Sequence, residues 1–277
     1  MFDSGPTTRL QRSRGTASVG FVCRQGRAQL ATLEQAGSAK AMLPRVHGVV
    51  PEVVFLNTSG GLTGGDRLSY HLEIPPDTEV TGTTQTAERG YASPGPAASV
   101  RVTASVGAGG RLNWLPQETL IYENAHVSRE TKIELYGNAT CLLVETIVLG
   151  RHAMGEVPRQ ARLTDRKLVQ RDGRPVWAET LHFDRQALSQ TGQPAVLNGA
   201  NCFAVIALIA PDAPDLTERI RSTLTEPGCR SAASGWAGKL LVRITATDGW
   251  PLRCQIARTL RALIPLPRVW QMPGVDR

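Results

Sequence analysis

The chain has 277 residues, of which 41% are hydrophobic and 20% charged, so it can bury a full core and is not a disordered protein. Its net charge of +7 comes mostly from dispersed arginines, and aromatic residues make up only 5%, which disfavours a nucleic-acid-binding protein with a stacking platform. The longest apolar run, 202–210, is too short to cross a bilayer, and the N-terminus lacks a signal-peptide core; a cytoplasmic protein with no membrane contact is expected.

The N-terminal region is basic. The first 33 residues contain five arginines and a single acidic residue, Asp3. We expect residues 1–18 to form a flexible basic tail on a single domain that spans 1–277. An organelle transit peptide is the second interpretation of this segment.

Most of the chain reads as short strands separated by turns. Apolar and polar residues alternate in Leu68–Ile74 and Ser99–Val106, as in half-buried strands. Arg171, Asp172 and Gly173 form a hairpin signal between two such runs. The other expected strands are Val49–Leu56, Glu79–Thr84, Arg111–Leu115, Glu130–Leu135, Ala139–Leu149, Arg162–Gln170, Pro175–Phe183, Asn201–Ala210 and Lys239–Thr247. The pattern predicts a mainly β fold, an irregular stack of sheets of the β-helix-like kind.

Two helices are expected near the C-terminus. Asp215 suits an N-cap with Glu218 three residues later, and Pro227 ends this helix. The second helix places apolar residues of 252–264 on one stripe and ends at Pro265. Both apolar faces are expected to contact the core.

A glycine cluster lies between the first two expected strands. Gly60, Gly61, Gly64 and Gly65 fall within six residues, and Asp66 follows directly. No lysine with Ser or Thr follows, so a P-loop is excluded, and the spacing does not fit a dinucleotide-binding loop. A tight or bulged β-connection is the simpler interpretation, and a functional role for Asp66 is the alternative.

Metal-binding and catalytic signatures are weak. The five cysteines are scattered without a C-x-x-C motif, and the five histidines form no H-x-H or H-E-x-x-H motif, so no tight metal site is expected. No G-x-S-x-G nucleophile elbow is present. Carboxylates between 118 and 156 could supply an acid–base pair, but Glu130 and Glu134 are expected on a solvated strand face. An enzyme is therefore not expected, and no catalytic residue is assigned.

Four short motifs, in order, resemble the urease accessory protein UreD family, called UreH in some organisms. Residues 57–66 resemble its N-P/T-x-G-G-L-x-G-G-D signature, and 83–91 resemble T-T-Q-x-A-x-K-x-Y. In the second motif Arg89 replaces the usual lysine and Gly90 replaces a β-branched residue. Residues 112–125 resemble L-x-W-x-P-Q/E-x-x-I-x-F-x-x-A, and 149–156 match L-G-R-x-x-x-G-E. The resemblance covers about residues 20–185.

The resemblance implies a non-catalytic urease maturation factor. Family members act with UreF and the GTPase UreG on apo-urease (UreABC), and the metallochaperone UreE supplies nickel. The fold implied is β-helix-like, with an internal passage that conducts Ni²⁺ in transit without binding it tightly. A self-standing nickel carrier or storage protein is the alternative function.

The resemblance also selects site residues. Five carboxylates in or beside the motifs are predicted to line the nickel passage or its mouth: Asp66, Glu88, Glu118, Glu145 and Glu156. Arginines predicted to make structural or partner contacts are Arg89, Arg151, Arg258 and Arg261. The C-terminal segment 252–277 is expected to contribute to a surface for UreF or urease, with a core-packed helix as the alternative. In the structural alternative for the motifs, Asp66 caps the glycine turn and Arg151 pairs with Glu156.

Overall fold

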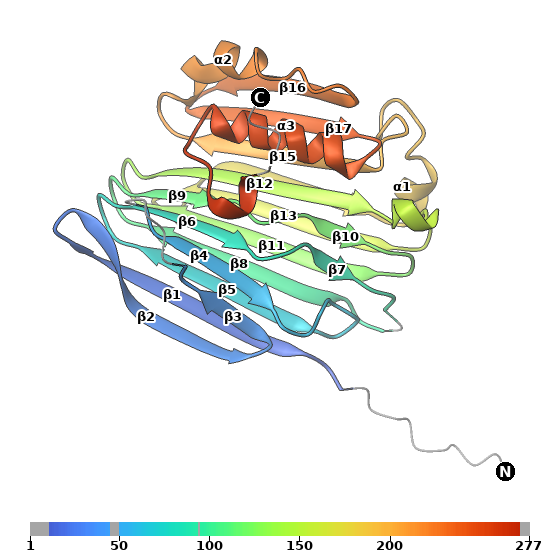
Figure 1. The fold of residues 1–277 in the computed structure, drawn as a ribbon, viewed down its shortest axis with the longest axis horizontal. Helices are drawn as coiled ribbons and strands as arrows, with labels where there is room; N and C mark the ends of the chain where they lie inside the picture. The colour runs from blue at the N-terminus through green and yellow to red at the C-terminus, as the bar shows by residue number, and fades with distance from the viewer. Residues whose placement is uncertain (1–10, 45–49, 94, 272–277) are drawn as a thin grey trace.

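The computed structural model describes residues 11–44, 50–93 and 95–271, and shows two stacked sheets with helices over one of them (Figure 1). The first sheet has the strand order β14-β13-β11-β8-β5-β1-β2. Its strands are β1 (Arg14–Arg24), β2 (Arg27–Gly37), β5 (Arg67–Ile74), β8 (Ala98–Val106), β11 (His126–Leu135), β13 (Arg162–Arg171) and β14 (Arg174–Phe183).

The second sheet faces the first and extends beyond it. Its order is β16-β17-β15-β12-β9-β6-β4-β3, with β7 and β10 joined at its side. Its strands are β3 (Ala39–Met42), β4 (Glu52–Asn57), β6 (Glu79–Thr84), β7 (Glu88–Gly90), β9 (Arg111–Trp114), β10 (Thr119–Ile121), β12 (Thr140–Leu149), β15 (Cys202–Ile209), β16 (Cys229–Trp236) and β17 (Lys239–Ala246).

The central part is a β-solenoid of about four turns. From β4 to β13 the chain passes alternately from one sheet to the other, and each main strand pairs in parallel with the strand one coil earlier. Strands with inward apolar residues on alternate positions favour this arrangement, because both sheets then bury one face between them. The colours of Figure 1 follow the chain from coil to coil, which confirms the predicted β-helix-like fold.

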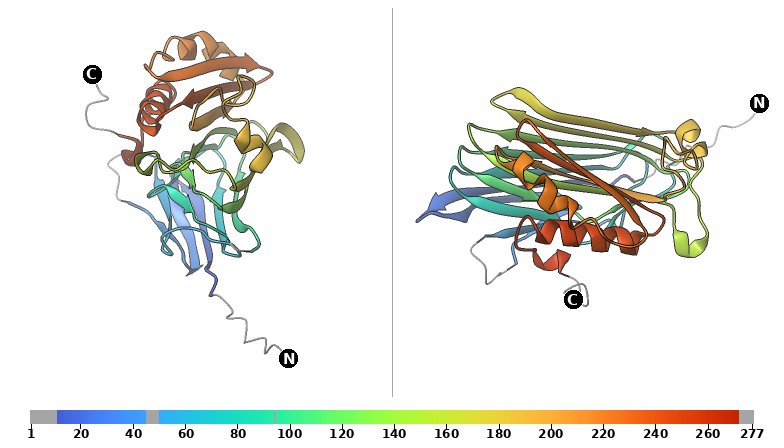
Figure 2. Two further views of the ribbon diagram at one scale, coloured as in Figure 1. Left: turned by 90° about the vertical axis from the view of Figure 1, so that its right-hand side faces the viewer. Right: turned by 90° about the horizontal axis from the view of Figure 1, so that it is seen from above.

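The helices near the C-terminus cover the outer face of the second sheet, on the side formed by β15, β16 and β17. The short elements are η1 (His152–Met154), α1 (Arg185–Ser189), η2 (Ala213–Leu216), α2 (Thr217–Arg221) and η3 (Arg268–Trp270), and the longest helix is α3 (Gly249–Arg261). α3 buries Leu252, Ile256 and Leu260 against this face, so a second apolar core lies outside the sandwich. Figure 2 shows α3 on one side only of the second sheet.

Several elements differ from expectation. β1 begins at Arg14, so Arg14–Ser18 are strand rather than tail, whereas residues 1–10 lie outside the described part of the chain. A tail was expected because this segment is rich in arginine. The side chains of Ala17, Val19 and Phe21 are nevertheless buried at alternate positions, as in a strand that packs on the core. Val49, the expected start of β4, also lies outside the described residues.

The helix boundaries differ too. The first C-terminal helix begins as a 3₁₀ turn at Ala213, so Asp215 lies in its first turn and is not the N-cap. Pro214 favours this start because its fixed φ and missing N–H are tolerated in the first turn of a helix. α3 begins three residues earlier than expected because Asp248 caps it, accepting a hydrogen bond from the Trp250 backbone N–H at 2.7 Å.

Candidate functional site

The glycine cluster forms a tight connection from β4 to β5 in which only glycine fits at some positions. Gly61 has a φ of 152°, and a Cβ there would lie 2.3 Å from the Tyr91 ring. This close approach lets the Leu62 N–H donate to the carbonyl of Arg89 at 2.7 Å, which ties the loop to β7. The simpler interpretation, a packed β-connection, therefore accounts for these glycines.

Asp66 closes this loop by accepting backbone hydrogen bonds. Its carboxylate accepts from the Thr63 N–H at 2.8 Å and from the Ser13 N–H at 2.7 Å, and the residue is buried. Both contacts are local to the loop and to the start of β1. The geometry is that of a cap, as the structural alternative expected.

Glu156 and Arg151 pair with each other at the end of the fourth motif. Arg151 Nε lies 2.7 Å from Glu156 Oε2, and the guanidinium lies 4.8 Å from the centre of the Tyr122 ring. The hydrogen bond from Arg151 holds the pKa of Glu156 below its ordinary value. Glu156 also accepts from the Glu123 N–H at 3.1 Å, so it fastens the loop after β12 to the loop after β10.

Glu118 lies on the other side of the second sheet. Its carboxylate is 3.3 Å from Arg253 Nη1, and Arg253 also donates to Gln117 at 2.6 Å. Both residues border an apolar pocket of about 280 Å³ that reaches the exposed side chain of Trp250. Glu118 is therefore separated from the interior of the sandwich by the second sheet.

Glu88 is half-buried beside the glycine loop. The Asn57 side-chain amide donates to both of its oxygens at 3.3 Å, and these residues line a small cavity of about 50 Å³. Burial raises the pKa of Glu88, and the hydrogen bond from Asn57 and the charge of Arg129 only partly offset this effect. Glu88 is thus a half-buried carboxyl that interacts electrostatically with Arg129.

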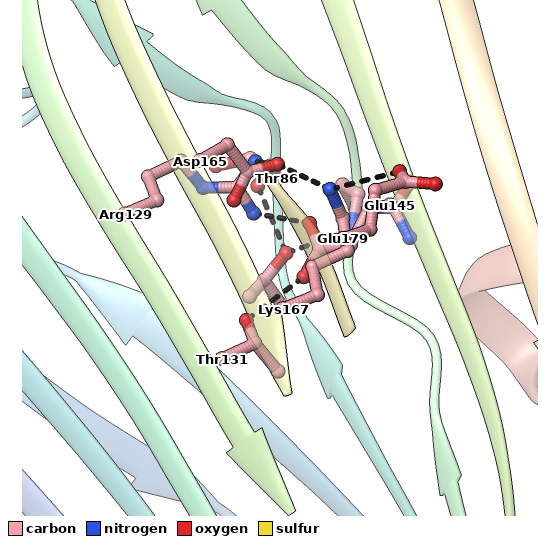
Figure 3. A network of polar contacts seen from close by, with 9 residues as sticks. Thr86, Arg129, Thr131, Glu145, Asp165, Lys167 and Glu179 are labelled. Carbon is pink, nitrogen blue, oxygen red and sulfur yellow. Dashed lines mark hydrogen bonds and ion pairs between the residues drawn. The ribbon is translucent and has the colours of Figure 1, made fainter. Parts of the chain in front are cut away.

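Glu145 belongs to a buried network of charges between the sheets, shown in Figure 3. We call this network the ionic cluster; its members are Arg129, Glu145, Asp165, Lys167, Glu179 and Arg243.

Its inner end is centred on Arg129. This guanidinium binds Glu145, and its second nitrogen lies 3.6 Å from Asp165. Thr131 donates to Glu145 at 3.2 Å. Burial by itself would lower the pKa of Arg129, but the charges of Glu145 and Asp165 outweigh it and the pKa is raised.

Its outer end opens to a pocket. Lys167 Nζ lies 2.7 Å from Asp165 and 3.6 Å from Glu179, and Glu179 also binds the exposed Arg243 of β17. These groups and Glu145 line a pocket of about 390 Å³ whose wall continues along β14 and residues 195–197. The interior charges are therefore reachable from the surface.

Two polar atoms in this cluster have no hydrogen-bond partner, Arg129 Nη1 and Asp165 Oδ1. Asp165 is fully buried, and its Oδ1 accepts no hydrogen bond. A buried oxygen without a donor is costly, and such an atom accommodates water or a cation readily. Among the described residues, no three His, Cys, Asp or Glu side chains are grouped so that they could hold a metal ion.

Most residues of the cluster were not predicted from the sequence. Of the five predicted carboxylates, Glu145 lies in it and Glu88 interacts with its inner end, whereas Asp66, Glu118 and Glu156 lie elsewhere. A signal was present: Asp165 and Lys167 alternate in phase with the apolar Leu163 and Val169, so they had to point inward.

The predicted arginines differ in their surroundings. Arg258 pairs with Glu226 at 2.8 Å and donates to Thr225, so it holds α3 to the loop before β16. Arg89 forms the edge of the small cavity beside Glu88. Arg261 lies exposed in the last turn of α3.

Comparison with known proteins identifies relatives over nearly the whole chain. Residues 13–271 match the family model described as UreD urease accessory protein. The urease accessory protein UreD of Paracoccus denitrificans (strain Pd 1222) is 51% identical over 274 residues, which cover 98% of this chain and 97% of the relative. That of Cereibacter sphaeroides (strain ATCC 17025) is 52% identical over 268 residues, which cover 96% and 98%.

Proposed function

The chain belongs to the UreD family of urease accessory proteins and is a urease maturation factor, and from this premise we propose that it conducts Ni²⁺ through the ionic cluster toward apo-urease. The resemblance seen in the four motifs is thereby confirmed. UreD accessory proteins are non-catalytic chaperones, as expected for this chain. None of the described helices is long and apolar enough to span a membrane.

The observation that carries the proposal is a group of charges buried between two otherwise apolar sheets. Charges cost free energy when they are removed from water, and a core of this size has no structural need for them. They line a pocket of about 390 Å³, and oxygen ligands with retained water suit an ion that must leave again. We call the line from this pocket through the ionic cluster to Glu88 the polar passage.

The predicted residues then take different roles. Glu145 and Glu88 offer oxygens along the polar passage, at its middle and at its inner end. Asp66 and Glu156 support it indirectly, because each fixes a loop by accepting backbone hydrogen bonds. Glu118 acts outside it, in a contact with α3 that bears on partner binding.

We propose UreF, UreG and apo-urease as the partners, with UreE supplying nickel indirectly, in the cytoplasm. The surface beside α3 suits a protein partner, because Trp250 is 58% exposed at the mouth of an apolar pocket. Deleting residues 266–277 would not test this surface, since Trp270 is buried and donates to the Leu115 carbonyl at 2.8 Å. Trp250→Ala is the better variant: loss of UreF or urease from a pull-down, with an unchanged circular dichroism spectrum, would support the contact.

The proposal is tested in cells that carry a urease operon from which only this gene is deleted. Restoring the wild-type gene is expected to restore ureolysis and the nickel content of purified urease. Glu145→Gln should leave the complex with urease assembled but lower the nickel content, because the passage loses an anionic ligand. Glu130→Gln is the matched control, since Glu130 lies on the solvated face of β11 and pairs with Arg101 at 2.8 Å. Normal nickel content with Glu145→Gln would contradict conduction through the cluster.

A further inference from the structure

The ammonium of Lys167 lies between two carboxylates of the polar passage. It lies 2.7 Å from Asp165 Oδ2 and 3.6 Å from Glu179 Oε1, and only 3% of the side chain is exposed. Two carboxylates thus share one cation. Asp165 Oδ1, the buried oxygen without a hydrogen bond, belongs to the same carboxylate.

The charges of the cluster are already balanced. Three carboxylates, those of Glu145, Asp165 and Glu179, face the cations of Arg129 and Lys167 inside and of Arg243 at the surface. A divalent cation added to this set would leave two uncompensated positive charges in a region of low dielectric constant. Such a state is strongly unfavourable, so the ion can enter only if a resident cation withdraws.

Lys167 is the resident cation that can withdraw. It lines the pocket of about 390 Å³, whereas Arg129 lies behind Glu145 and does not line that pocket. Its ammonium is a compact charge on a flexible four-carbon stem, while a guanidinium is planar and binds carboxylates with several fixed donors. Motion of the lysine stem into the pocket removes the ammonium from Asp165 and Glu179 together, while Arg129 and Arg243 stay beside them.

We propose that the Lys167 ammonium is a gate: a resident counter-cation that a divalent cation displaces from Asp165 and Glu179, and that returns when the ion moves on. This inference rests on the proposed conduction of nickel and adds its regulation. The closed state keeps the passage neutral and stable when no metal is present. The open state binds the ion weakly, because the returning ammonium competes for the same oxygens.

The test uses the full-length chain and Ni²⁺ alone, in calorimetric titrations. Lys167→Met removes the competing charge at similar side-chain volume and is expected to bind Ni²⁺ at least ten-fold more tightly than wild type. Asp165→Asn combined with Lys167→Met should lose this gain, because one of the two ligands is neutral. Lys132→Met is the matched control, since Lys132 is exposed on the outer face of the same sheet, and its affinity should equal that of wild type.

Lys167→Arg provides a second measurement that does not depend on how Lys167→Met folds. It keeps the positive charge but is expected to hold both carboxylates more firmly, so the nickel content of urease should fall at least several-fold while the complex still assembles. A purely structural lysine predicts normal nickel content for this variant and no affinity gain for Lys167→Met, and either of these results overturns the gate. The proposed conduction fails separately, if Glu145→Gln leaves the nickel content of urease unchanged.

Discussion

The early and late coils of the solenoid place different residues at the same two inward positions. Parallel pairing stacks these positions directly from strand to strand across β5, β8, β11 and β13. The two stacks read Leu68, Val100, Arg129, Asp165 and Tyr70, Val102, Thr131, Lys167. In the first stack the change from apolar to charged residues occurs between β8 and β11; in the second, Thr131 of β11 is polar and the charge appears at Lys167 of β13.

The neighbouring inward stacks remain apolar along their whole length. The stack that follows the charged ones along each strand consists of Leu72, Ala104, Ile133 and Val169. The stack that precedes them consists of Ala98, Val127 and Leu163. The backbone is therefore the same in both regions, and only two rows of side chains differ. Since apolar residues fill these rows in the early coils, the fold does not need charges there. We attribute the charges of the late coils to function.

The first test of this difference removes one charge from the late coils. Arg129→Met leaves Glu145 buried without its cation, and the free energy of unfolding should fall by about 3–5 kcal/mol. Chemical denaturation of the full-length chain measures this loss. Arg101→Met is the control, because the Arg101–Glu130 pair is exposed on the outer face of the same sheet and should contribute less than about 1 kcal/mol. Equal losses would show that burial does not distinguish the two pairs.

The glycine loop at the early coils gives a second, smaller effect. Gly61→Ala brings a Cβ against the Tyr91 ring and, at 2.8 Å, the Arg89 carbonyl, so we expect a loss of about 1–3 kcal/mol from strain, with further loss from overlap. Gly60→Ala meets no atom within 4 Å and carries only the cost of its positive φ, about 1–2 kcal/mol. Thermal unfolding of both variants separates close approach from backbone conformation. Indistinguishable melting temperatures would argue against the close packing of Gly61.

The early and late coils also differ in how well their strands could be predicted from the sequence. The strands were predictable where alternation was clean, as in β5 and β8, and the hairpin from β13 to β14 followed from Asp172 and Gly173. Strand β11 was expected to start at Glu130, four residues late, because Arg129 broke the apolar pattern. For the same reason Arg129 was not predicted to point inward. With β11 extended to His126, Arg129 falls in phase with Val127 and Ile133, which places its side chain in the interior.

Other parts of the site could not be predicted from local sequence. Glu145 meets Arg129 only because β12 and β11 lie in opposite sheets, and Glu179 meets Arg243 across 64 residues of chain. Such contacts depend on how the coils stack. Asp66 and Glu156, chosen from the family motifs, lie outside the cluster and accept backbone hydrogen bonds at a glycine turn and at a loop end.

Glu88 lies beside the glycine loop and interacts electrostatically with Arg129 of the late coils. Its substitution gives the smallest predicted change in stability. Burial raises the pKa of Glu88, so the folded protein holds this proton more tightly than the unfolded chain does. The stability associated with Glu88 is complete below its ordinary pKa of about 4.5 and is lost as the pH rises through the raised folded value. Glu88→Gln should remove that fall. Unfolding free energies measured from pH 4 to pH 7 check it; parallel pH profiles for variant and wild type would contradict the assignment.

The most direct measurement replaces the charged rows of the late coils with apolar residues, as the early coils have them. A variant with Arg129→Met, Glu145→Met, Asp165→Met and Lys167→Met removes two charges of each sign and leaves Glu179 paired with Arg243. We predict that its unfolding free energy equals that of wild type or exceeds it by about 1–4 kcal/mol, and that urease matured with it contains little nickel. A folded variant that still delivers nickel to urease would contradict the account, and so would a large loss of stability.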